Sequence, residues 1–212
     1  MKRNSMLLAI VGAMLALVAP ASAMAKVTIV PAGHNFEISG SSPVIQGSLT
    51  GSCSITKITG TIPAAPGNEG EVVDSKLAAP TVSCGAGVTA TVGGGEWKLR
   101  STQGVYLTFV TVPANGLTLR YTSLPGCKLT NTGTYPVGAV WGNGIPAASR
   151  STLHFHGIIG MTWQNDGSSC AMAGKTENVS VESPTAGPTP SYSVVTDTTN
   201  KASIVLLNPG VY

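Results

Sequence analysis

Apolar side chains occupy every other position through most of the run Ser151–Trp163, and His154 and His156 fall between them. Successive side chains of a β-strand point to opposite faces, so a period of two predicts one long strand. The two histidines are expected on its outward face. The face expected in the core consists of Leu153, Phe155, Ile159, Met161 and Trp163.

The rest of the chain after residue 25 repeats this pattern in shorter runs that Gly, Pro and Asn interrupt. No window of about 11 residues keeps the apolar spacing of an amphipathic helix. We therefore expect an all-β, antiparallel fold, either a β-sandwich or a barrel-like double sheet. The expected strands are 27–30, 35–39, 44–50, 54–62, 72–82, 84–92, 96–100, 104–112, 117–122, 151–163, 178–182, 192–196 and 202–207.

Two short segments predict tight turns between these strands. The triplet Gly93-Gly94-Gly95 predicts a hairpin or a bulge, because glycine adopts positive φ at little steric cost. Asn115-Gly116 lies between two apolar runs and is a strong hairpin signal. Pro80 predicts an edge position for 72–82, since proline cannot donate to a central ladder. The proline-rich segment 183–191 is expected to be a loop.

Residues 1–25 have the organisation of a secretory signal peptide. A basic start precedes the apolar run 6–20, and small residues then form overlapping A-x-A sites. The apolar run is shorter than the ~20 residues that a spanning helix needs. We expect cleavage after Ala25, with a cut after Ala23 as the alternative. The remaining domain, 26–212, is expected to be secreted, periplasmic or at the cell surface, with no further transmembrane segment.

Charge and composition narrow the classes of partner. Loss of Lys2 and Arg3 with the signal leaves ten basic and nine acidic residues, a net charge of +1. A charge this small gives no electrostatic basis for binding nucleic acid or anionic lipid. Charged residues make up only 10% of the chain, but β-branched residues are abundant, which argues against disorder.

Four cysteines lie after the signal, and an even number in an oxidising compartment favours two disulfides, with three pairings open. CSITKITGTIP at Cys53 is echoed by CKLTNTGTYP at Cys127, and CGAG at Cys84 by CAMAG at Cys170. The echo favours the pairs Cys53–Cys84 and Cys127–Cys170, and two pseudo-repeated halves at about 26–115 and 116–212. Zinc is the alternative role for these cysteines, but the sequence contains no C-x₂-C pair.

His154 and His156 form an H-x-H pair whose imidazoles project from one face of a strand. That spacing suits two ligands of Zn²⁺ or Cu²⁺. A third ligand would have to come from another part of the chain, and His34 and Asp166 are the candidates. The competing interpretation is a pair of solvent-facing residues on the polar side of the strand. No cofactor is expected.

The sequence offers no recognisable catalytic constellation. It has no G-x-S-x-G elbow, and three histidines give few choices of base for a nucleophile. Glu69, Glu71 and Asp74 cluster in an apparent loop, whereas a glycosidase needs two facing carboxylates. We expect no enzymatic activity.

The tryptophans are candidates for stacking on sugars, because aromatic rings present flat apolar faces. Trp163 shares the core parity of its strand, so we expect it to be buried. Trp141, between glycines in GAVWGNG, is a better candidate for exposure than Trp97 or Trp163. Packing in the core or against a hairpin is the competing interpretation for Trp141.

Several segments together carry a resemblance: PAGHNFEISG at 31–40, the paired cysteines, CKLTNTGTY, WGNG, and an STLHF strand before the last cysteine. This arrangement resembles a group of small exported bacterial β-proteins, some of them labelled alkane-oxidation activator-like. The resemblance implies an extracellular or surface-associated protein without enzymatic activity. It assigns no functional residue, and His154 and His156 are not part of its pattern.

These observations predict a secreted, disulfide-stabilised β-protein with a structural role or an interaction role at a surface or matrix. Its expected partner is an extracellular or surface component, with a second copy of the chain or a glycan as candidates. A carbohydrate- or metal-binding extracellular module, resting on Trp141 or on His154 and His156, is the alternative. A secreted hydrolase is the second alternative.

Overall fold

The computed structural model describes residues 26–40, 43–102, 107–142, 151–186, 189–190, 193–202 and 204–207. The expected signal peptide lies outside this part. These residues form an all-β structure without a helix, which confirms the predicted antiparallel class. In the part described, no helix is long and apolar enough to cross a membrane.

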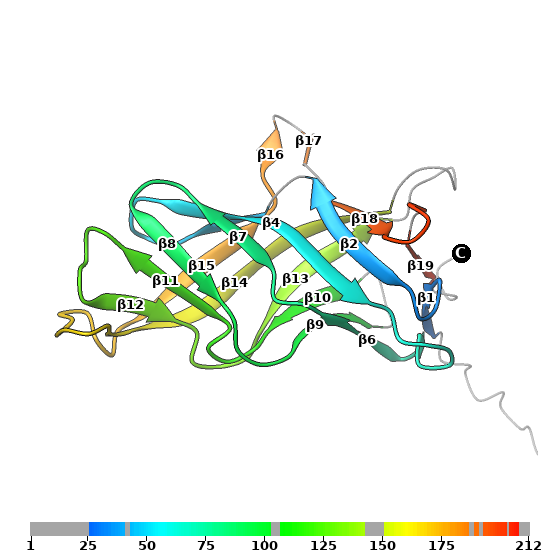
Figure 1. Cartoon of the computed structure of the whole chain (residues 1–212), viewed down its shortest axis with the longest axis horizontal. Coiled ribbons are helices and arrows are strands. Elements are labelled where there is room, and N and C mark those ends of the chain that lie inside the picture. Colours follow the sequence, from blue (N-terminus) through cyan, green and yellow to red (C-terminus); the bar gives the residue numbers. More distant parts are fainter. Residues whose placement is uncertain are drawn as a thin grey trace, which may run out of the picture.

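The strands of the described residues are numbered in chain order (Figure 1). They are β1 (Val27–Val30), β2 (Asn35–Gly40), β3 (Val44–Gln46), β4 (Ser52–Thr61), β5 (Glu69–Gly70), β6 (Val72–Leu77), β7 (Thr81–Cys84), β8 (Val88–Val92), β9 (Trp97–Thr102), β10 (Leu107–Val112), β11 (Leu117–Tyr121), β12 (Cys127–Thr130), β13 (Tyr135–Gly142), β14 (Ser151–Asn165), β15 (Thr176–Glu182), β16 (Thr185–Ala186), β17 (Thr189–Pro190), β18 (Ser193–Asp197) and β19 (Val205–Leu207).

Eight of these strands close into an antiparallel barrel. The order around the wall is β13-β10-β9-β6-β4-β2-β18-β14, and β14 pairs again with β13 to complete the circle. Of the two architectures expected from the sequence, the structure adopts the barrel. Closure pairs both edges of each of these strands and so removes the open edges of a sandwich.

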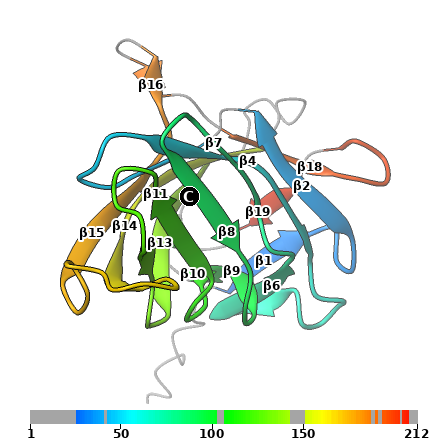
Figure 2. The ribbon, with the colours of Figure 1, turned by 60° about the vertical axis from the view of Figure 1, so that its left-hand side comes forward.

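Two long strands carry the sheet beyond the barrel. β14 continues past β13 and pairs with β15 on one edge and with β12 on the other. β4 continues past β2 and pairs with β3 and β7. β15 joins β3, and β12 continues to β11 and β8, so these outer strands surround one end of the molecule. Figure 2 shows this arrangement from the side of β8 and β11.

β14 belongs to both the barrel and the outer strands, and its alternation buries one face along most of its length. The five side chains predicted for the core are 0–2% exposed, which confirms that prediction. Full burial of such side chains contributes roughly 1.5–3 kcal/mol each. Gly157 interrupts this inward row. A Cβ there would lie 3.1 Å from the Cα of Val137, so a side chain would crowd the neighbouring strand.

The predicted disulfides are confirmed. Cys53 and Cys84 lie directly opposite each other in the β4–β7 ladder. Cys127, on β12, is bonded to Cys170 in the turn that follows β14. The echoed sequences around them nevertheless adopt different structures. The first is a ten-residue strand, and the second is the four-residue β12 followed by a turn into β13.

Neither predicted hairpin turn joins two paired strands. β8 pairs with β11 rather than β9, and β10 pairs with β9 and β13 rather than β11. Both turns instead cross between the barrel and the outer strands, where they pack against each other. A Cβ on Gly95 would lie 2.5 Å from Pro113 Cβ. Gly94 and Gly95 both have positive φ, and so does Asn115.

A buried amide explains why the chain leaves the barrel at this turn. The side chain of Asn131 is fully buried and accepts a hydrogen bond from Leu117 N at 2.8 Å. Its Nδ2 donates to Pro113 O and Gly133 O at 2.6 and 2.9 Å. These contacts hold the start of β11 against the end of β12, which competes with the β10–β11 pairing of a hairpin.

Other differences concern the ends of the strands. The expected strand 44–50 ends at Gln46, and 183–191 contains the short pair β16–β17. The segment 72–82 divides at Pro80 into two strands with different positions. β6 lies inside the barrel wall between β4 and β9, so the predicted edge position is wrong for it. β7 pairs only with β4 and is an edge strand.

Candidate functional site

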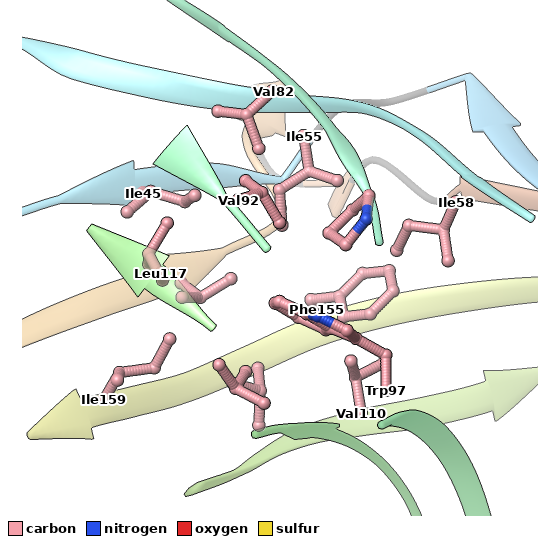
Figure 3. A pocket seen from close by; sticks show the side chains of 14 residues that line it. Ile45, Ile55, Ile58, Val82, Val92, Trp97, Val110, Leu117, Phe155 and Ile159 are labelled. Carbon is pink, nitrogen blue, oxygen red and sulfur yellow. The ribbon is translucent and has the colours of Figure 1, made fainter. Parts of the chain in front are cut away.

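The barrel and the outer strands enclose an apolar cavity where they meet. It contains about 20 Å³ of space for the centre of a water molecule. Every side chain that lines it is apolar, and they come from strands of both parts. Figure 3 shows Trp97 and Phe155 at its centre, with Ile55, Val82 and Val92 along one side.

A bulge in β4 supplies two of the lining residues. The register with β7 shifts between Ile55 and Lys57, and Thr56 and Lys57 are both exposed. A bulge inserts one extra residue into a strand and changes which residues face inward. Ile55 and Ile58 therefore both face the cavity, although an odd spacing in a regular strand would place them on opposite faces.

Trp97 provides the only polar atom among the side chains lining the cavity. The alternation of β9 buries Trp97 and Leu99 and exposes Arg100. Within the described residues, Trp97 Nε1 is buried and has no hydrogen-bond acceptor. A buried donor left unpaired costs about 1–3 kcal/mol. The surface of the cavity is nevertheless entirely apolar, so this N–H does not face it.

One side of the cavity is closed by side chains rather than by a hydrogen-bonded ladder. Ile55, Val82 and Val92 are only half-buried, and they lie on β4, β7 and β8. Among the described strands, β7 pairs only with β4 and β8 only with β11, so their free edges flank this side. Side chains here can move apart without breaking a ladder.

The two histidines predicted as metal ligands lie on the outward face of β14. His154 is opposite Val140 on β13, and His156 is opposite Gly138. His156 Nδ1 lies 3.6 Å from Glu182 Oε1. In the described part of the chain, no group of three His, Cys, Asp or Glu side chains is arranged to hold a metal ion. Metal binding by the pair therefore lacks a third ligand from these residues.

Both residues considered as third ligands have other partners. Asp166 forms an ion pair with Arg120, and this guanidinium is the main reason that the pKa of Asp166 is lowered. His34 Nδ1 donates to Asp197 Oδ2 at 2.7 Å. The acidic cluster expected in a loop is also divided, because Asp74 lies on β6 and binds Arg100 through both carboxylate oxygens.

Trp141 packs in the core, which was the competing interpretation to a sugar-stacking role. Its side chain is 1% exposed, so it cannot offer a ring face to a sugar in solution. In β13 it shares the inward parity of Val137 and Ala139, and that alternation outweighs the flanking glycines. Trp163 is buried as predicted, and its Nε1 donates to Glu177 Oε2 at 3.1 Å.

The His34–Asp197 pair is the most buried charged contact in the described part. Asp197 is fully buried, and its Oδ1 accepts a hydrogen bond from Thr199 N at 2.7 Å. Burial raises the pKa of this carboxyl group, but the hydrogen bonds from Thr199 and His34 lower it by a larger amount. The pKa of Asp197 is therefore below its usual value. The carboxylate therefore stabilises the turn between β18 and β19 in its ionised form.

We expect Asp197→Asn to lower the free energy of unfolding by about 1–3 kcal/mol at pH 7, because charge-assisted hydrogen bonds are lost. The pKa of Asp197 in the folded state lies below its unfolded-state value of about 3.9. The ionised side chain therefore contributes its full stabilisation when the pH is above about 3.9. It disappears as pH falls through the folded pKa. Urea unfolding at pH 7 and pH 3 should show the variant and the parent converging at the lower pH. A difference that is constant with pH would contradict this role.

No family model, curated protein or solved structure matches this chain. Sequence reasoning did not identify Trp97 and the cavity around it. A signal was present, because Trp97 and Leu99 alternate with charged residues in a short run, which predicts an inward-facing indole.

Proposed function

We propose that this chain is an exported, non-enzymatic β-barrel protein that acts by contact with a surface outside the cytoplasm. Two disulfides are typical of proteins in oxidising compartments. The resemblance to small exported bacterial β-proteins supports the same location. The observation that carries the proposed contact role is a group of side chains on the outward face of the barrel, two of them apolar and largely exposed.

This group, the outer patch, consists of Phe109, Val140, His156 and Ile158. Val140 and Ile158 are 56% and 58% exposed, and they lie on the adjacent strands β13 and β14. A row of three residues lies across the strands between them. In this row, half-buried Phe109 is opposite Gly138, and Gly138 is opposite His156. Gly138 has no side chain, so this part of the face is shallow.

The composition of the patch indicates how it would bind. Single exposed apolar residues are normal, but several on one face of a molecule are typical of contact sites. A mature net charge of +1 gives little long-range attraction, so contact would depend on apolar area. Glu182 beside His156 gives the patch a polar edge.

The proposal predicts that Val140→Thr combined with Ile158→Thr moves the protein from the cell-associated fraction to the culture supernatant. Threonine favours strands, so the outward substitutions should leave the barrel folded. Val72→Thr is the matched control, because Val72 is a 50% exposed valine on β6, outside the outer patch. Quantitative blotting of the fractions measures the distribution. Equal distributions for the three proteins would contradict the contact role, and a cytoplasmic protein with free thiols would contradict export.

A further inference from the structure

We propose that a groove on the outside of the barrel binds an acidic sugar, meaning a sugar unit that carries one carboxylate or sulfate group. The groove lies over β2, β4 and β6, whereas the outer patch lies over β10, β13 and β14. The inference therefore goes beyond contact through the outer patch and does not depend on it. It rests on three features of the groove: its size, an unpaired lysine and the hydrogen-bonding groups beside that lysine.

The groove has the size of a small-molecule site and is open to solvent. It contains about 530 Å³ of space, and such sites typically measure about 300–1,000 Å³. Figure 1 shows β2 and β4 side by side. The register places Asn35, Thr61 and Lys76 next to one another across β2, β4 and β6, and all three are exposed. Thr198, in the turn after β18, also lines the groove.

Lys76 provides a positive charge that the protein does not compensate. In the described part of the chain it has no acidic partner. A second lysine, Lys98, lies directly opposite it on β9. Like charges at directly opposite positions of neighbouring strands are destabilising. Lys98 is held by Glu96 and Asp74, at 3.3 and 3.9 Å, so Lys76 is the cation that an anionic ligand would stabilise.

The acidic side chains near the groove leave room for an anion, because each of them is paired with a cation. Glu37, opposite Thr59, lies 2.8 Å from Lys57 Nζ. Asp74 binds Arg100 through both carboxylate oxygens. One unpaired lysine suits one anionic group and not a run of phosphates.

Neutral polar groups beside Lys76 determine the rest of the ligand. Thr61 Oγ1 donates to Asn35 Oδ1 at 2.6 Å. The amide NH₂ of Asn35 has no acceptor among the described residues, so it can donate to a ligand. The hydroxyl group of Thr59, which also lines the groove, can donate and accept. Sugar hydroxyl groups likewise donate and accept, so they match these side chains.

A matched pair of probes tests the proposal: methyl β-D-glucuronide and methyl β-D-glucoside, which differ only in having a carboxylate or a CH₂OH group at C6. The measurement is the saturable shift of the backbone N–H signals of Asn35, Thr61 and Lys76 in ¹⁵N–¹H spectra. The protein is purified with both disulfides formed. Methyl β-D-glucoside 6-sulfate and inorganic sulfate are two further probes, which separate the kind of anion from the contribution of the sugar.

We expect the glucuronide to bind about fivefold more tightly than the glucoside at low salt, because it gains one exposed ion pair with Lys76. This preference should decrease as sodium chloride is added, since salt screens exposed charges. Whichever of the glucuronide and the 6-sulfate binds more tightly identifies the anionic group of the ligand. Inorganic sulfate should bind more weakly than both, and binding as tight as theirs would overturn the role of the sugar.

Lys76→Gln tests the charge. The variant should lose the preference for the glucuronide and keep its affinity for the glucoside. It should unfold at the same temperature or a higher one, because it removes a repulsion from Lys98, so the loss of preference would not reflect a loss of folding. Lys128→Gln, on β12 and outside the groove, is the matched control and should retain the preference.

Thr59→Val tests the neutral part of the groove. It removes one hydroxyl group and should weaken both glycosides by a similar factor, while the preference for the glucuronide remains. Equal affinities for the two glycosides in the parent protein, or a preference that persists in Lys76→Gln, would overturn the role of Lys76. Shifts that do not saturate, or that are spread evenly over the barrel, would overturn the site.

Discussion

Asn131→Leu is expected to lower the free energy of unfolding by about 3–5 kcal/mol, a large part of the 5–15 kcal/mol typical of a folded domain. Leucine is close to asparagine in size but cannot form hydrogen bonds. The substitution leaves Leu117 N, Pro113 O and Gly133 O without the partners they have now. Each buried polar group left unpaired costs about 1–3 kcal/mol. Urea unfolding monitored by tryptophan fluorescence measures the change.

The matched control for this prediction is Asn178→Leu. Asn178 is exposed on β15, so the same change of side chain should alter the free energy of unfolding by less than about 0.5 kcal/mol. Similar losses in the two variants would mean that leucine itself, and not the buried amide, is responsible. A loss below about 1 kcal/mol at Asn131 would contradict the view that this residue fixes the crossover from β10 to β11.

Removal of one disulfide in the double variant Cys53→Ala and Cys84→Ala is expected to cost about 4 kcal/mol. The bond joins residues 31 positions apart, and the loss follows from the greater chain entropy of the unfolded state. Alanine avoids placing a hydroxyl group at the buried position of Cys53. The change is measured as the shift in urea midpoint under non-reducing conditions.

This variant should also loosen one strand more than the rest of the protein. β7 pairs only with β4, and the disulfide is the covalent link between these two strands. Hydrogen exchange at Val82 and Ser83 should therefore accelerate more than exchange along β14. The control is the double variant Cys127→Ala and Cys170→Ala, whose link closes a slightly longer separation of 43 residues. It should lose a similar amount of global stability, but hydrogen exchange in β7 should not accelerate selectively. Selective acceleration in β7 in both variants would contradict the role of the Cys53–Cys84 disulfide in holding β7 against β4.

The parts of the fold that depend on local pattern were predictable. The inward row of β14 follows from a period of two, because alternation alone decides which face of a strand is apolar. The disulfide pairs followed from the echoed sequences at Cys53 and Cys127. The pairing of strands around Asn115-Gly116 was not predictable, because the outcome depends on Asn131, which is distant in sequence and forms hydrogen bonds to both sides of that turn.

In the candidate site, too, local pattern was predictable and contacts between distant residues were not. The flanking glycines made Trp141 a candidate for exposure, but its parity with Val137 and Ala139 places it in the core. His154 and His156 lie on one outward face as expected, yet whether a third ligand lies near them depends on tertiary structure. The cavity required the β4 bulge and the meeting of two sets of strands, neither of which a single sequence reveals.

Export and cross-linking by two disulfides can be tested together by peptide mapping with mass spectrometry, without reduction, on protein isolated from separate cell fractions. We expect the protein to be found outside the cytoplasm and to start near Lys26. It should yield cross-linked peptides for Cys53–Cys84 and Cys127–Cys170. Protein confined to the cytoplasm, with residues 1–25 retained and all four cysteines free, would contradict export and cross-linking.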